Sequence, residues 1–121
     1  MKRPQKYYGR EITLRIRINP SYYALPHSHA ETFGLKEGSA IFTQGELIYN
    51  HKEVINNNIS LLMDGEIADW FEENLPIGIF DFKVRLLYGV VKTKTTASNG
   101  IFIDSEGVIQ LLVIDKPKSA E

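Results

Sequence analysis

The chain contains no cysteine, and it also lacks the apolar runs that mark membrane spans and signal peptides. Without cysteine there is no disulfide framework, no thiolate metal site and no cysteine nucleophile. No apolar run approaches the roughly 18 residues of a membrane helix, and the first residues lack the apolar segment of a signal peptide. We therefore expect a soluble, cytoplasmic protein that does not contact a membrane.

Two signatures of catalysis are missing as well. The nine glycines are scattered at expected turns, so none of them belongs to a phosphate-binding loop. No nucleophile, base and orienting group can be placed together from the sequence. These absences favour a binding protein over an enzyme, and we expect no cofactor, no bound metal and no small-molecule substrate.

What is present is an ordinary globular composition in 121 residues, the length of a single domain with a real core. The net charge of −1 hides an asymmetry, because six of the first seventeen residues are cations and five acids lie between residues 64 and 73. We predict a basic N-terminal arm over residues 1–10, one β-rich barrel domain over 11–115 and a polar tail over 116–121.

The hydrophobic pattern predicts mostly strands. Residues 11–18 alternate strictly between apolar and polar side chains, which is typical of a half-buried strand. Residues 52–63 are expected to be extended, and two short helices are expected, one ending at Gly34 and one running from Asp64 to about Asn74. The balance predicts a mainly β (α+β) fold, a small barrel with one inserted helix.

Two hairpins are predicted from the glycines that interrupt strand-like segments. Residues 39–50 would turn near Gln44 and Gly45. A second turn at Tyr88 and Gly89 would join the strands on either side of it.

The second hairpin would pair like charges. With Tyr88 and Gly89 in the turn, Arg85 would face Lys92, and Lys83 would face Lys94. Four cations on one face destabilise a sheet unless something negative lies nearby. The acidic helix near residues 69–73 is one candidate, and a phosphate backbone is the other.

Residues 25–41 resemble a family of transcription factors. The residues that carry the resemblance are Leu25–Pro26, the run 33–36 (Phe-Gly-Leu-Lys) and Gly38. In this spacing they resemble the AbrB/SpoVT-like swapped-hairpin family, and a similar turn occurs in double-psi barrels. The resemblance covers about residues 12–49 and implies a swapped-hairpin or double-psi-like barrel that binds DNA. Tyr22 and Ala30 stand where the family often has arginine.

Two histidines invite a metal interpretation. His27 and His29 are expected on a helix, where alternate residues diverge by about 200° and do not converge on one ion. We therefore expect them to lie on the surface as ordinary side chains.

A short motif leaves a nuclease as a further alternative. Asp81 and Lys83 match the Asp-x-Lys half of a metal-dependent nuclease site, with Asp64 or Asp69 as the second carboxylate. The motif is short and lies on an alternating strand, where charged side chains are expected in any case.

The function expected from these patterns is the binding of nucleic acid, namely double-stranded DNA, by a homodimeric transcriptional regulator. The cations expected to contact phosphates are Lys2, Arg3, Lys6, Arg10, Arg15, Arg17, Lys83, Arg85, Lys92 and Lys94. The alternatives left open are a non-catalytic assembly or adaptor protein and, second, the metal-dependent nuclease.

Overall fold

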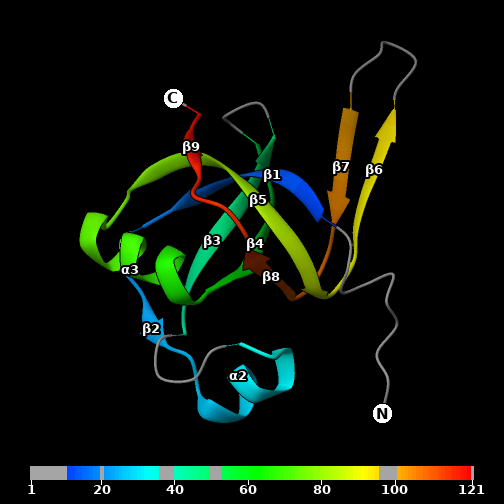
Figure 1. Cartoon of the computed structure of the whole chain (residues 1–121). Coiled ribbons are helices and arrows are strands. Elements are labelled where there is room, and N and C mark those ends of the chain that lie inside the picture. The colour runs from blue at the N-terminus through cyan, green and yellow to red at the C-terminus, as the bar shows by residue number, and fades with distance from the viewer. Residues whose placement is uncertain (1–10, 20, 36–39, 50–52, 96–100, 121) are drawn as a thin grey trace.

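Five strands form the body of the molecule (Figure 1). The computed structural model describes residues 11–19, 21–35, 40–49, 53–95 and 101–120. The five strands are β1 (Glu11–Ile18), β3 (Ile41–Tyr49), β4 (Glu53–Met63), β5 (Gly78–Tyr88) and β8 (Ile109–Val113). The other elements are β2 (Tyr23–Ala24), α2 (His27–Phe33), α3 (Gly65–Asn74), β6 (Val91–Thr95), β7 (Ile101–Ser105) and β9 (Lys118–Ser119).

The five strands close into a barrel. They follow the order β1–β3–β4–β8–β5, and β5 pairs again with β1 over its length. Every pair in the ring is antiparallel except β4–β8, which is parallel. The predicted small mainly β barrel with one inserted helix is confirmed.

The strand order also defines the type of barrel. The third and fifth strands of the ring, β4 and β8, are the parallel pair, and α3 connects the third strand to the fourth. A five-stranded barrel with this order has the topology of the OB-fold. In that scheme the first connection holds β2 and α2, and the last connection holds the β6–β7 hairpin.

The core fills the barrel and is closed at one end by α3. On β1, Leu14, Ile16 and Ile18 are buried while the intervening polar residues are not, so the predicted alternation is confirmed. Ala68 and Phe71 of α3 are fully buried in the same cluster. The helix begins after Asp64 and ends at Asn74, as predicted.

The first predicted hairpin is wrong, because residues Ile41–Tyr49 form one uninterrupted strand, β3. Gly45 lies in the middle of that strand. A Cβ there would approach Ile16 Cγ2 to 2.7 Å and the Arg17 carbonyl oxygen to 3.0 Å. The glycine therefore permits β1 to cross closely over β3, and it does not make a turn.

The second predicted hairpin is also wrong. β5 lies between β1 and β8 in the barrel, whereas β6 pairs with β7. Arg85 therefore lies opposite Glu11 and Lys83 opposite Thr13, and neither faces a lysine. Figure 1 shows the β6–β7 hairpin standing out from the barrel, away from α3.

The segment with the family resemblance forms a second, outer cluster. Pro26 precedes α2, and Gly34 ends it in the left-handed conformation (φ +70°), as predicted. Leu35 is buried and Phe33 half-buried against the outside of the barrel, where Leu62 and Leu87 are also covered. Residues 36–39, which include the predicted Gly38, lie outside the described residues. The short helix thus covers one half of an outer sheet face.

The expected polar tail also contributes to the sheet. Lys118–Ser119 form β9, which pairs with Phe80 and Asp81 of β5. Within this segment the backbone therefore extends the sheet for two residues beyond the barrel strands.

Candidate functional site

The strands β1 and β5 carry four of the ten predicted binding cations, and there they form ion pairs. Arg15 donates two hydrogen bonds to Asp81, from Nε at 2.9 Å and from Nη2 at 3.2 Å. This bond raises the pKa of the Arg15 guanidinium above its usual value. Arg17 donates from Nε to Glu46 at 2.8 Å. We call Arg15 and Asp81, with Glu11, Lys83 and Arg85, the charge-paired face; the Arg17–Glu46 pair lies between β1 and β3 instead.

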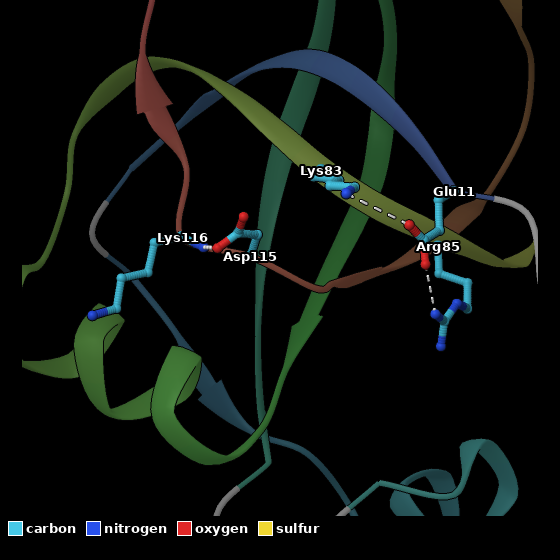
Figure 2. Close-up of polar contacts among 5 residues, drawn as sticks. All are labelled: Glu11, Lys83, Arg85, Asp115 and Lys116. Atoms are coloured by element: carbon cyan, nitrogen blue, oxygen red, sulfur yellow. Dashed lines mark hydrogen bonds and ion pairs between the residues drawn. The ribbon is translucent and has the colours of Figure 1, made fainter.

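One carboxylate neutralises the other two cations of this face (Figure 2). Glu11 accepts a hydrogen bond from Arg85 Nη2 at 2.9 Å, and Lys83 Nζ lies 3.7 Å from its other oxygen. The sequence pattern offered the acidic helix or a phosphate backbone for this role. The structure assigns it to Glu11, because barrel closure brings the start of β1 against β5.

The remaining predicted cations lie elsewhere. Lys92 is exposed at the base of the β6–β7 hairpin, where its register partner is Asp104. Lys94 lies opposite Phe102, and its side chain is outside what the structure describes. The arm residues Lys2, Arg3, Lys6 and Arg10 fall outside the described residues. Among the described residues, the predicted cations are therefore divided between β1 and β5 and the β6–β7 hairpin.

A different polar surface lies on β4, where the strand is irregular. Between Ile59 and Asn56 this strand has two residues, Asn57 and Asn58, opposite a single residue of β3. Such a bulge breaks the alternation of inward and outward side chains. Both Asn57 and Asn58 are exposed as a result, whereas Asn56 is buried.

The buried Asn56 holds the bulge and ties it to the hairpin. Its Oδ1 accepts the backbone N–H of Asn58 at 2.7 Å. Its Nδ2 donates to Ser105 Oγ at 3.1 Å and to the Gly107 carbonyl oxygen at 2.8 Å. One amide thus holds the β4 bulge against the turn between β7 and β8, so that these two segments keep a fixed position relative to each other.

Three shallow depressions follow one another over this surface. The first has a volume of about 260 Å³ and is lined by Arg17, Ile18, Asn19, Gln44, Gly45, Glu46 and Asn57. The second has about 360 Å³ and is lined by Val54, Ile55, Asn56, Asn57, Ser105, Glu106 and Gly107. The third has about 290 Å³ and is lined by Val90, Lys92, Ser105 and Glu106.

The shared lining residues show that the depressions adjoin. Asn57 borders the first and the second, and Ser105 with Glu106 borders the second and the third. We call this row the amide track. It runs from Arg17 on β1, across the β4 bulge, to Lys92 at the base of the hairpin.

The chemistry of the amide track differs from that of the charge-paired face. Four of its nine described polar lining residues are carboxamides, which donate and accept hydrogen bonds without charge; four others are charged and one is a serine. The cation at each end shares its depression with a carboxylate, Arg17 with Glu46 and Lys92 with Glu106. The arrangement suits an extended ligand that offers both donors and acceptors along its length.

Sequence reasoning did not find this site. The only signal was the run of three asparagines inside an expected strand, because asparagine is depleted in regular strands. Such a run in a strand indicates a bulge that presents side chains.

The two other candidate sites do not gain support from the geometry. Asp81 is engaged by Arg15, and Lys83 lies beside Glu11, so the two residues of the nuclease motif have other partners. The backbone of His27 and His29 belongs to α2, as expected, and their side chains lie outside what the structure describes. Among the described residues, no group of three or more histidine, aspartate or glutamate side chains is placed to hold a metal ion.

Comparisons with known proteins leave the chain without a match. No protein-family model, no curated protein and no solved structure matches it. No helix within the described part of the chain has the length and apolar character needed to cross a membrane.

Proposed function

We propose that the protein binds single-stranded nucleic acid along the amide track. The observation that carries this proposal is the continuous row of three depressions across β3, the β4 bulge and the base of the hairpin. In OB-fold barrels, the face of the second and third strands and the loops flanking it bind oligonucleotides and oligosaccharides. The amide track occupies that position, between the segment after β1 and the β6–β7 hairpin.

The size of the depressions supports a single strand. Their volumes of about 260, 290 and 360 Å³ lie below or just above the lower limit of about 300 Å³ for pockets that take one small ligand. A flexible strand with separated bases can place one unit in each depression, whereas a duplex keeps its bases stacked and paired. This differs from the duplex expected from the sequence, which depended on a platform of unpaired cations.

The charge of the chain supports nucleic acid over an oligosaccharide. The basic segment 1–10 joins the barrel at Glu11, which lies opposite Arg85, three residues before the end of β5. The turn after β5 leads into the hairpin that borders the amide track. Four cations within the first ten residues of the sequence favour a polyanion.

Fluorescence anisotropy with labelled 12-mers tests the proposal. We expect the single-stranded DNA or RNA 12-mer to bind more tightly than the duplex of the same sequence at low salt. Equal or tighter binding of the duplex would instead support the binding of double-stranded DNA, which the sequence predicts. Absence of binding to every strand would contradict a nucleic-acid function, and incubation of the same samples with Mg²⁺ tests strand cleavage.

A second candidate function, protein assembly, is favoured by one apolar patch. Tyr88, Val90 and Val108 are 59%, 51% and 56% exposed around the close approach of Gly89 to Val108. Exposed apolar side chains that lie together often mark protein contacts. A sizing column run without nucleic acid tests this candidate, and a homodimer there would be consistent with the dimer proposed from the sequence.

A further inference from the structure

We infer that the amide track recognises the bases of the strand and makes few contacts with its phosphates, so that binding depends on base identity. This inference rests on the proposed function, and it names the part of the ligand that the site reads. It is carried by the hydrogen-bonding chemistry of the lining residues and by the balance of charge along the row.

Carboxamides match bases better than they match phosphates. Each Asn or Gln side chain has two N–H donors and a carbonyl oxygen that accepts. Phosphate oxygens only accept, so an amide on a phosphate leaves its own acceptor without a donor. Base edges present donors beside acceptors, and amides form paired hydrogen bonds with them. Asn19, Gln44 and Asn57 therefore have partners on a base for both ends of the amide.

The described lining residues offer hydrogen-bonding groups and no aromatic ring on which a base could stack. Proteins that bind single strands regardless of sequence use aromatic platforms, because every base has a π face. Among the described residues that line the three depressions, none is aromatic. Hydrogen bonds to base edges, unlike stacking, differ from one base to another.

The backbone beside the central amide, Asn57, is held in place before any ligand arrives. Asn57 lies in the bulge, whose neighbouring N–H, that of Asn58, is bonded to the buried Asn56. A side chain presented from a fixed backbone loses less freedom on binding than one on a mobile loop. Preorganised donors and acceptors also discriminate more strongly, because a wrong base leaves them unpaired.

The charges of the row limit its contacts with phosphate. Of the described residues, two cations, Arg17 and Lys92, border the depressions, and each shares its depression with a glutamate. For single strands, log K falls with log salt by about 0.7 for each phosphate that is neutralised. Two contacts at most therefore give a slope of about −1.4 from the track. Any steeper dependence belongs to other cations of the chain, such as those of segment 1–10.

The test compares octamers with and without bases, using the full chain at moderate salt. One labelled octamer carries a mixed sequence, and the other has the same backbone with abasic sites throughout. We expect the abasic strand to bind at least tenfold more weakly, and homopolymers of A, C and T to differ from one another. Asn57→Ala should weaken binding of the base-bearing strand about five- to tenfold and leave the abasic strand unchanged.

Asn74→Ala is the matched control, because Asn74 is an exposed asparagine at the end of α3. It should bind every strand as the natural chain does. Equal affinity for base-bearing and abasic strands would overturn the inference and leave nucleic-acid binding intact. No binding to either strand would instead overturn the proposed function. An equal loss on both strands in Asn57→Ala would show a contact with the backbone and also contradict base recognition.

Discussion

The charge-paired face and the amide track lie on neighbouring strands of one barrel, but they use polar side chains in opposite ways. On the charge-paired face, Glu11 lies directly opposite Arg85, and Arg15 directly opposite Asp81. Opposite charges in register across two strands stabilise the pairing. Arg85 Nε is nevertheless buried without a hydrogen-bond partner among the described residues. The charges there are explained by barrel closure.

The amide track has no such internal explanation for its exposed side chains. Asn57 and Asn58 project from a bulge that the fold maintains through the buried Asn56. A bulge interrupts the hydrogen-bond ladder between two strands. A strand with one residue fewer at this place would pair regularly and keep the ladder intact. In this barrel the charged side chains of β1 and β5 stabilise the pairing of the two strands. The exposed amides of the β4 bulge have no such structural partner among the described residues, and we therefore propose that they bind a ligand.

The largest effect should come from removing the support of the amide track. Asn56→Ala deletes an acceptor for Asn58 N–H and a donor to the Gly107 carbonyl oxygen, at a side chain that is 7% exposed. We expect the free energy of unfolding to fall by about 2–3 kcal/mol, because buried groups lose their partners. Urea denaturation measures this change.

Asn58→Ala is the control for that experiment. It removes an exposed amide from the same bulge but keeps the backbone N–H that Asn56 binds. Its stability should stay within about 0.5 kcal/mol of the natural chain. Similar losses in both variants would show that the bulge depends on the exposed amides and not on the buried one.

Elements such as β1 and α3 could be predicted from the sequence, because the pattern of their own residues indicates a strand and a helix. The alternation at residues 11–18 and the capping position of Asp64 both describe what the structure shows. Pairing between distant strands could not be predicted. Glu11 and Arg85 are 74 positions apart, and nothing local indicates that they meet.

The two wrong hairpins have the same physical origin. The sequence places Gly45 and Gly89 in hairpin turns between neighbouring strand segments. In the structure Gly45 lies within β3, and Gly89 (φ +95°) lies in the bend between β5 and β6, which pairs with β7; both glycines also lie where another segment approaches closely. A Cβ at Gly89 would lie 2.7 Å from the Val108 carbonyl oxygen. A close approach depends on the tertiary fold, so a glycine alone does not distinguish it from a turn. The site was missed for a related reason, since a bulge is defined only by the register of its partner strand.

A smaller effect is expected on the charge-paired face. Asp81→Ala removes the carboxylate that Arg15 binds, and both side chains are 35% exposed. We expect a loss of about 0.5–1 kcal/mol, because solvent and salt screen an ion pair at this depth. Urea denaturation at low and high salt measures it, with Arg15→Ala and the double variant completing a cycle. A coupling energy of about 2 kcal/mol or more would show that the Arg15–Asp81 ion pair stabilises the barrel more than its exposure indicates.

Substitution of one lysine on each surface compares the contributions of the amide track and the charge-paired face to binding. Lys92→Ala removes a cation at the end of the amide track, whereas Lys83→Ala removes one that lies beside Glu11. We expect Lys92→Ala to reduce the salt slope for a single-stranded 12-mer by about 0.7, and Lys83→Ala to leave it unchanged. Anisotropy titrations over a range of salt concentrations give both slopes. If Lys83→Ala had the larger effect, the strand would cross the charge-paired face.

The smallest effect concerns pH, and it tests whether the Arg15–Asp81 ion pair persists at alkaline pH. The hydrogen bond to Asp81 raises the pKa of Arg15 above its usual value. A raised pKa in the folded chain means that the stabilising contribution is complete below the unfolded pKa and is lost only as the pH rises through the folded one. Because both values lie far above neutrality for arginine, the Arg15–Asp81 coupling should be the same at about pH 7 and about pH 9. Double-variant cycles by urea denaturation at the two values measure it. A coupling that weakens on the alkaline side would mean that some other group, and not the guanidinium, holds this pair together.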